Sequence, residues 1–275
     1  MEKERETDKT FAPLTVIKVG GAVVEDEAQL TRLINDFSAI PGRKVLVHGG
    51  GRRATKVAAA LGIESKMVDG RRITDADMLE VVTMVYGGLV NKNIVAKLQA
   101  RGICALGLTG ADMDVIRSHK RPLKKVRTDD GTERMVDFGF VGDVDRADGE
   151  RLAMLIEGGI TPVVAPLTHD GDGNILNTNA DTMASTVAKA LARKYDVTLI
   201  FSFEKKGVLA NPDDDDSVIP TITRETYNKY VEDGTISGGM MPKIENSLEA
   251  VEAGVKRVII TLATQIDGQH GTVIN

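Results

Sequence analysis

The sequence predicts an α/β fold, a three-layer αβα sandwich with a mainly parallel central sheet. Short runs rich in β-branched residues alternate along the 275 residues with longer segments of helical period. This alternation is typical of parallel strands joined by crossover helices, which cover the sheet on both faces. Hydrophobic residues make up 42% of the chain and charged residues 27%, which is enough apolar material for such a core.

The order of the expected elements places the loops in which we look for chemistry. The expected strands are residues 14–19, 45–47, 103–108, 161–165, 197–201 and 258–262. The expected helices contain good helix formers after an Asp, Thr or Asn start, and are residues 26–39, 52–61, 75–101, 181–194 and 243–253. Two β-hairpins are expected at residues 64–74, turning at Asp69-Gly70, and 124–141, turning at residues 129–131. In wound sheets ligands bind beyond the carboxyl ends of the strands.

Charge and composition narrow the partners and the compartment. A net charge of -5 argues against a general nucleic-acid binder, which needs a basic face. No run approaches the ~20 apolar residues of a membrane span, so we expect no membrane partner and a cytoplasmic protein. The one cysteine, Cys104, cannot form an internal disulfide, which fits a reducing compartment. Because it lies in an apolar run, we expect it to be a buried strand residue.

Two glycine turns follow expected strands. The first strand ends in Lys18-Val19-Gly20-Gly21, and the second in His48-Gly49-Gly50-Gly51 before a helix. Glycines here let backbone N–H groups turn toward an anion beside a positive helix end, although tight turns often need glycine for steric reasons alone. Lys18 favours the phosphate interpretation, because a lysine inside an apolar strand must find a partner and can reach a phosphoryl oxygen from this turn.

Two later clusters have the same character. In the segment 177–181, Asn179 or Asp181 is expected to cap the helix that follows. In the segment 237–243 a glycine turn leads into a helix whose first turn contains Lys243. A cation there opposes the helix dipole, at a cost of ~0.3 to 1 kcal/mol, so an adjacent anion would explain it.

Several other motifs are assigned to plain structure. No Walker A sequence and no G-x-G-x-x-G after a strand is present. The segment 170–174 resembles an EF-hand loop, but Ile175 replaces its glycine and Asp181 its glutamate, so we expect a turn. The acidic run 213–216 is expected to be a solvated turn, and the basic run 119–127 a solvated hairpin arm.

Six motifs in register along most of the chain resemble the amino-acid kinase family. They are Lys18 with Gly20-Gly21, and the segments 48–51, 70–74, 137–142, 177–181 and 238–243. The Asp-Phe-Gly-Phe-Val-Gly segment at 137–142 resembles the members that phosphorylate an N-acylglutamate more than aspartokinases or uridylate kinases. The resemblance implies a single domain, with the acyl-amino-acid substrate and the dimer contact in a lobe of about 12–175 and ATP in a lobe of about 176–275.

The resemblance also implies a reaction. ATP would phosphorylate the γ-carboxylate of N-acetyl-L-glutamate, or of another N-acylglutamate such as N-succinylglutamate, as a step in arginine biosynthesis. A γ-carboxylate with a pKa of ~4.3 is already ionised at pH 7, so the enzyme's task is positioning and charge stabilisation. Mg²⁺ would be carried by the ATP phosphates, with no metal ligands from the protein.

Individual roles follow by motif. Lys18 and Lys243 would neutralise charge on the transferring phosphoryl group, and Asp181 would hold the two lysines. The residues implied for the acylglutamate are Gly49, Gly50, Arg72 and Asn177. Those implied for ATP are Gly20, Gly21, Glu204, Gly207 and Gly239.

The chain also departs from the family's pattern. Where the family usually has Thr/Ser-Asp near the nucleotide, this chain has Phe203-Glu204. Its polar residues 1–10 do not resemble the long helix by which arginine-inhibited hexamers interlock, and its end resembles the family's only at residues 271–274, so we expect an unregulated homodimer. Two alternatives stay open: another small-carboxylate kinase of the same fold, and an inactive ligand-binding regulator. Arg71, next to Arg72, is a candidate for a charged acyl group or an exposed hairpin residue.

Overall fold

A central sheet of eight strands organises the protein. The computed structural model describes residues 11–68, 70–127 and 133–275. The strand order is β14-β16-β15-β13-β1-β2-β10-β5, in which β15 and β16 pair antiparallel and the other neighbours pair parallel. The strands are β1 (Ala12–Val19), β2 (Arg43–His48), β5 (Ala105–Leu108), β10 (Thr161–Val164), β13 (Tyr195–Phe203), β14 (Thr221–Ile222), β15 (Arg257–Leu262) and β16 (Thr272–Ile274). The expected mainly parallel sheet is confirmed.

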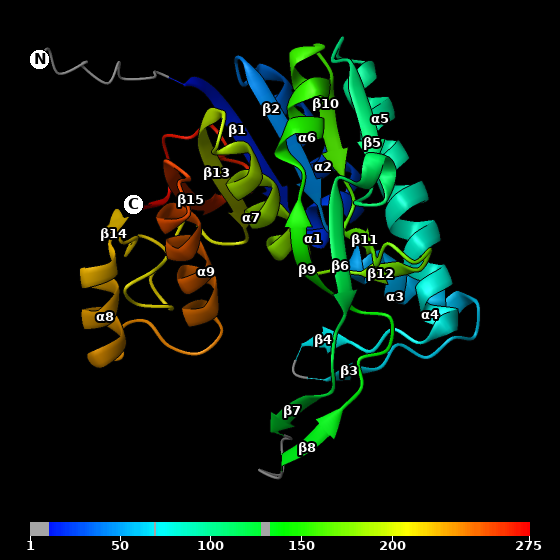
Figure 1. Ribbon diagram of the computed structural model, residues 1–275. Coiled ribbons are helices and arrows are strands. Elements are labelled where there is room, and N and C mark those ends of the chain that lie inside the picture. Colours follow the sequence, from blue (N-terminus) through cyan, green and yellow to red (C-terminus); the bar gives the residue numbers. More distant parts are fainter. Residues whose placement is uncertain (1–10, 69, 128–132) are drawn as a thin grey trace, which may run out of the picture.

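Helices cover both faces of this sheet (Figure 1). One face is covered by α1 (Gly21–Glu25), α2 (Glu27–Ala39), α3 (Gly51–Ala60), α4 (Ala76–Val82), a π-helix (Thr83–Val90) and α5 (Asn91–Gln99). The other is covered by α6 (Gly149–Glu157), α7 (Ala180–Leu191), α8 (Arg224–Glu232) and α9 (Met240–Glu252). Alternate residues of β1 divide between the two cores, with Val16 in one and Ile17 in the other. This period of two produces the three layers.

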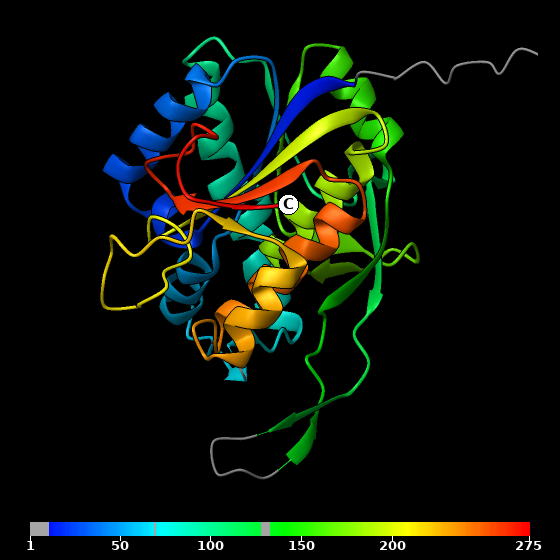
Figure 2. The same ribbon diagram turned by 90° about the vertical axis from the view of Figure 1, so that its left-hand side faces the viewer.

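A smaller sheet and two hairpins extend the molecule beyond one end of the central sheet. The smaller sheet has the order β12-β11-β6-β9, formed by Ile175–Asn177, Leu167–His169, Ile116–Lys120 and Gly142–Ala147. The hairpins are β3 (Met67–Val68) with β4 (Arg71–Arg72), and β7 (Lys124–Arg127) with β8 (Glu133–Val136). Figures 1 and 2 show both hairpins projecting at the same end of the molecule. Asp69 and the turn expected at residues 129–131 lie outside the described residues, as does the N-terminal segment 1–10.

Three sequence expectations need correction. Cys104 is exposed and precedes the strand, which begins at Ala105; β5 is the edge strand, so its start is open to solvent. The helix expected over 75–101 contains the π-helical turn at Thr83–Val90, a change of hydrogen bonding that apolar periodicity does not reveal. The helix expected to reach 194 ends at Leu191.

The polar segments behave as solvated turns. Asp170 accepts backbone hydrogen bonds from Asp172 and Asn174 in the tight connection between β11 and β12. In the acidic run, Asp215 and Asp216 pair with Lys205 and Lys206 at 2.7 Å and 2.6 Å. No helix in the described part of the chain is long and apolar enough to cross a membrane.

Candidate active site

Two glycine turns meet at the carboxyl ends of β1 and β2. The backbone N–H of Gly49 donates to the Val19 carbonyl at 2.9 Å. A Cβ added to Gly49 would lie 3.1 Å from the Gly21 nitrogen, and one added to Gly21 would lie 3.3 Å from the Gly50 nitrogen. The two turns therefore approach each other so closely that a side chain on either glycine would force its neighbour to shift, and α1 and α3 begin at Gly21 and Gly51, the last glycine of each turn. Backbone N–H groups at the start of a helix are suited to bind an anion, which is the role that the sequence predicts for these turns.

Lys18 and Asp181 form an ion pair beside these turns. The Lys18 Nζ atom lies 2.7 Å from Asp181 Oδ1, and their side chains are 11% and 28% exposed. Asn179, rather than Asp181, caps α7, since its side chain accepts from the backbone N–H groups of Asp181 and Thr182. The Asp181 carboxylate in the first turn of α7 is thereby left to face Lys18, which finds the partner that its place in a buried strand demands.

The second lysine is placed differently. Lys243 lies in the first turn of α9, with its Nζ atom 3.8 Å from the centroid of the Phe203 ring. Among the described residues no carboxylate oxygen lies within the 4 Å of an ion pair with it, so Asp181 pairs with Lys18 only. Burial lowers the pKa of Lys243; the charges of Asp181 and Glu204 raise it, and that of Lys18 lowers it further.

These groups line one cavity of about 540 Å³. Seven of the predicted site residues line it: Lys18, Gly20, Gly21, Asp181, Glu204, Gly207 and Lys243. Ser202, which sequence reasoning missed, also lines it, and its buried hydroxyl has no hydrogen-bond partner among the residues that the structure describes. Glu204 is exposed and lies 3.3 Å from Arg52 across the mouth. A Cβ on Gly207 would lie 2.8 Å from Thr272 Oγ1, which gives this glycine a packing role as well.

The remaining site candidates lie outside this cavity lining. Gly239 is the N-cap residue of α9, directly before Met240 at the cavity wall. Gly50 packs against Tyr86 of the π-helix, since a Cβ there would lie 2.9 Å from the Tyr86 ring. Tyr86 gave no sequence signal, because it is one more apolar residue in a helical period.

Arg72 is held by neutral acceptors. Its guanidinium donates to Ser65 Oγ at 2.7 Å, and to the Gly51 carbonyl and Thr55 Oγ1 at 2.9 Å each. No carboxylate within the described residues neutralises it. The guanidinium is fixed beside the glycine turns with its charge available for an anionic ligand.

Asn177 joins the substrate-side elements. Its Nδ2 donates to Thr74 Oγ1 at 2.9 Å, and its backbone N–H donates to the Phe140 carbonyl at 2.8 Å. Phe140 in turn donates to the Thr74 carbonyl at 2.7 Å. The segment after Arg72, the 137–142 segment and β12 are therefore hydrogen-bonded together, two residues before the Asn179 cap of α7.

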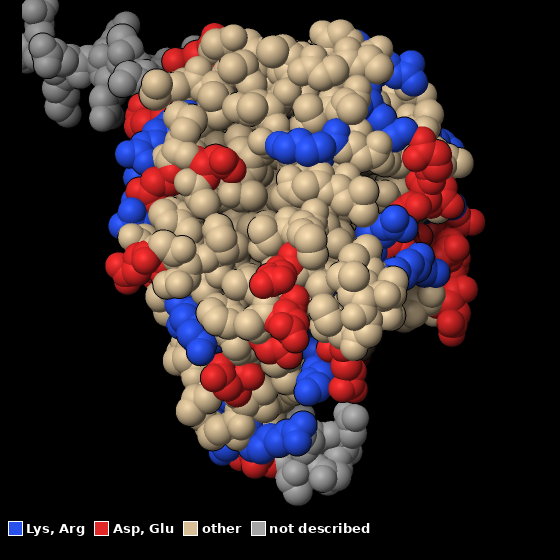
Figure 3. Space-filling view, turned by 90° about the vertical axis from the view of Figure 1, so that its right-hand side faces the viewer, with Lys and Arg blue, Asp and Glu red and all other residues tan. Residues whose placement is uncertain are grey.

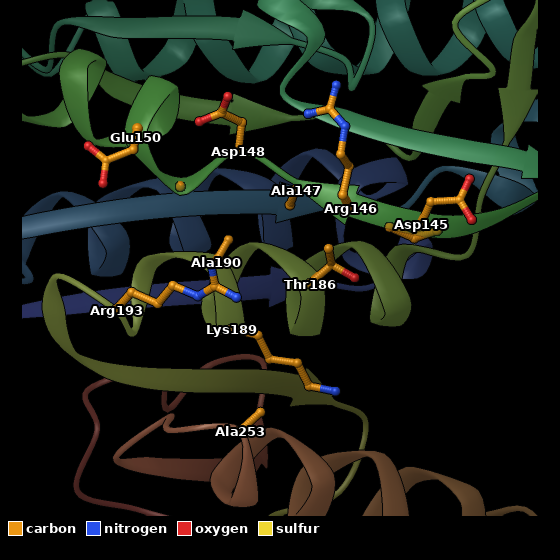
Figure 4. A pocket seen from close by; sticks show the side chains of 12 residues that line it. Asp145, Arg146, Ala147, Asp148, Glu150, Thr186, Lys189, Ala190, Arg193 and Ala253 are labelled. Carbon is orange, nitrogen blue, oxygen red and sulfur yellow. The ribbon is translucent and has the colours of Figure 1, made fainter.

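A second cavity, of about 660 Å³, lies along the C-terminal half of α7 and beside β9 (Figure 4). Its acidic side chains have partners outside it: Asp148 contacts Arg151 at 3.2 Å, and Glu150 contacts Lys194. None of the predicted site residues lines it. The predicted site residues are gathered instead at the cavity by the ends of β1 and β13.

Comparison with known proteins identifies the family to which this chain belongs. The model of the "Amino acid kinase family" matches residues 13–262. An acetylglutamate kinase of Bacteroides thetaiotaomicron is 66% identical over 261 residues, covering 95% of this chain and 98% of that protein. One from Bacteroides fragilis is 63% identical, covering 97% and 98%. A solved structure from Streptococcus mutans UA159 is 30% identical, with a TM-score of 0.71, and covers 95% of this chain and 98% of the other.

Proposed function

Because the chain belongs to the amino acid kinase family, we propose that it transfers the γ-phosphoryl group of ATP to the γ-carboxylate of N-acetyl-L-glutamate. The product is an acyl phosphate, made as a step in arginine biosynthesis. The observation that carries the proposal is the Lys18–Asp181 ion pair beside the unneutralised Lys243, at a cavity floored by two glycine turns.

The chemistry follows from the charges of this arrangement. The acceptor carboxylate is ionised at neutral pH and needs no general base. As an oxygen of the carboxylate forms its bond to the γ-phosphorus, the bond to the β,γ-bridging oxygen breaks and ADP leaves. Lys18 and Lys243 stabilise the negative charge on the equatorial and leaving oxygens, and Asp181 keeps Lys18 in place.

The substrate side is assigned to the lobe of about 12–175. Arg72 would pair with a carboxylate of the acylglutamate, Asn177 would bind the part of the substrate that carries the α-carbon, and Gly50 would donate its backbone N–H. The N–H of Gly49 is used by the Val19 carbonyl, so Gly49 would shape the turn beside the substrate without donating to it. The free charge of Arg72 and the hydrogen-bonded placement of Asn177 support these roles.

The nucleotide side is assigned to the lobe of about 176–275 and to Gly20 and Gly21. The cavity suits a nucleoside triphosphate in its donor set: two lysines, backbone amides and the unpartnered hydroxyl of Ser202. Glu204 and Gly207 line this space, and Gly239 precedes Met240, which also lines it. In this proposal Mg²⁺ is held mainly by the ATP phosphates, as is usual for this ion in phosphoryl-transfer sites.

A cytoplasmic homodimer completes the proposal. The π-helix exposes Met84 and Leu89, 54% and 49% exposed, and the adjoining edge strand β5 exposes Leu106. Uncharged surface covers much of the face on which these elements lie (Figure 3). Apolar side chains on an open sheet edge favour a second copy as partner. Light scattering should give twice the mass of one chain. The double variant Met84→Lys, Leu89→Glu should have the mass of a single chain.

A substrate panel tests the reaction and the acyl group. ATP- and Mg²⁺-dependent acyl phosphate, trapped as the hydroxamate, is measured with N-acetylglutamate, N-succinylglutamate, free glutamate and aspartate. Turnover of N-acetylglutamate supports the proposal. Turnover of N-succinylglutamate alone would mean that the substrate's acyl group is succinyl and not acetyl. Turnover of free amino acids alone would indicate another small-carboxylate kinase, and no turnover would favour a regulator.

A further inference from the structure

Lys243 is half-buried at the site but has no acidic partner. The other site lysine, Lys18, is neutralised by Asp181 at 2.7 Å. Lys243 has no carboxylate within 4 Å in the described parts of the chain, and burial lowers its pKa. A buried cation without a counter-ion needs another source of stabilisation if it is to stay charged and in one place.

The ring of Phe203 meets this need in the structure. The Lys243 Nζ atom lies 3.8 Å from its centroid, and Lys18 Nζ lies 5.6 Å from the same centroid. The negative face of an aromatic ring attracts a cation within about 6 Å. Phe203 therefore lies against both site lysines, and far more closely against the one that lacks an acid.

The ring is itself fixed. Phe203 is the last residue of β13 and stacks on Phe201, with 6.2 Å between the ring centroids and 26° between the planes. It packs against the core cluster that includes residues of α7 and α9. These contacts give the aromatic ring a defined orientation relative to Lys243.

We propose that Phe203 is a positioning residue that holds the Lys243 ammonium for phosphoryl transfer through a cation–π contact. This inference rests on the proposed function. A carboxylate in the same place would hold the lysine but cancel its charge, whereas a ring holds it and leaves the positive charge and the N–H donors for phosphoryl oxygens. The family pattern usually has Thr or Ser here, which would offer no such face.

The competing explanation is that Phe203 only packs against its neighbours. Changing the negative charge on the face of the ring, without changing its shape, distinguishes packing from a cation–π contact. Phe203 is replaced by 4-fluoro-, 3,5-difluoro- and 3,4,5-trifluorophenylalanine, which keep nearly the same shape and weaken the negative face stepwise. We expect kcat to fall stepwise, by about 3- to 30-fold at three fluorines. The KM values for ATP and the acylglutamate should change less than about twofold, because the fluorinated rings keep nearly the same shape where Phe203 lines the cavity.

The matched control is the same fluorination series at Phe201. Phe201 stacks on Phe203, and within the described residues no lysine or arginine lies over its ring. We expect a flat kcat there. Phe203→Trp should retain activity and Phe203→Leu should lose about tenfold. A flat kcat across the Phe203 series, or equal falls in both series, would overturn the proposal.

A readout without turnover keeps the inference separate from the proposed function. The protein is labelled with ¹³C at lysine Cε, and the Lys243 signal, assigned with Lys243→Arg, is titrated. The charged neighbours are Lys18 on β1, Asp181 on α7 and Glu204 after β13, and all are unchanged in the series. The Lys243 pKa should fall with each fluorine at Phe203. An unchanged pKa would refute the contact even in an active enzyme, whereas a falling pKa without acyl phosphate formation would refute only the proposed function.

Discussion

The ε-ammonium of Lys18 lies 2.7 Å from Oδ1 of Asp181, which ties the end of the central strand β1 to the first turn of α7. Of the two site lysines, this one is held by an acid and Lys243 by a ring. The pair concentrates positive charge where two backbone turns already present N–H groups.

Removing Lys18 should lower the catalytic rate strongly and weaken substrate binding only slightly. For Lys18→Met we expect kcat to fall about 10²- to 10³-fold, the usual effect of losing one preorganised donor to a developing charge. The KM for the acylglutamate should change much less. Lys256→Met is the control, because Lys256 forms an exposed ion pair with Asp196 and should leave steady-state kinetics unchanged.

Asp181 should control the alkaline limb of the pH profile. Lys243 is active as a cation, so activity is lost as pH rises through its pKa, which burial already lowers and Asp181 raises. Asp181→Asn removes the raising charge, and the alkaline limb of kcat should move to lower pH. An unmoved limb with reduced kcat would show that Asp181 acts on Lys18 alone.

Arg72 should determine substrate affinity. Arg72→Gln removes a charge held only by neutral acceptors, and we expect KM for the acylglutamate to rise about 10- to 100-fold, with a smaller effect on kcat. Arg71, exposed in the same hairpin, provides the matched variant. Arg71→Gln should leave KM for N-acetylglutamate unchanged; a rise specific to N-succinylglutamate would place Arg71 beside a longer acyl group.

The close approach of Gly50 to Tyr86 can be tested by a double-mutant cycle. Gly50→Ala would place a Cβ 2.9 Å from the Tyr86 ring and should lower kcat/KM. In a Tyr86→Val background the same change should cost less, because the ring that collides is absent. Equal costs in both backgrounds would mean that the backbone of Gly50, and not this contact, requires glycine.

His48 should make stability sensitive to acid. Burial lowers its pKa to about 4, outweighing the hydrogen bond to Gly49 that raises it. Its Nδ1 donates to the Gly49 carbonyl, and its Nε2 accepts from Asn91. In the unfolded chain this histidine takes up a proton near pH 6.5, whereas in the folded protein it stays neutral down to about pH 4. The free energy of unfolding therefore falls as pH drops from 6.5 toward 4.

Denaturant unfolding measures this effect. Between pH 7 and pH 5 we expect the free energy of unfolding to decrease by about 2 kcal/mol more in the wild type than in His48→Gln. Equal decreases in both proteins would contradict a neutral buried histidine.

The sequence alone predicted the layers, the parallel strands and the cavity residues that lie next to glycine turns. Lys18 stood out because a lysine interrupted an apolar strand just before two glycines. Lys44 interrupts β2 in the same way, yet it is buried with its ammonium donating to the carbonyls of Phe37, Ser38 and Ile40 at the end of α2. The two lysines differ in their place along the strand, since Lys18 lies near the carboxyl end of β1 and Lys44 near the start of β2.

Contacts between distant segments could not be predicted. Phe203 was visible only as a departure from a family pattern, because its place beneath Lys243 depends on how α9 packs against β13. Arg72 donates to Ser65 and Thr55 because of the path that its hairpin takes, and the sequence does not reveal that path. The prediction for Cys104 was wrong because apolar neighbours do not distinguish a buried strand from the open start of an edge strand.

The origin of the oxygen in released phosphate tests the central claim most directly. N-acetylglutamate labelled with ¹⁸O in its γ-carboxylate is incubated with the enzyme, ATP, Mg²⁺ and hydroxylamine, which attacks the acyl carbon and releases phosphate with the former carboxylate oxygen. If the carboxylate is the nucleophile, each phosphate formed will carry one ¹⁸O. Phosphate without ¹⁸O would show that water attacks ATP, and would contradict the account.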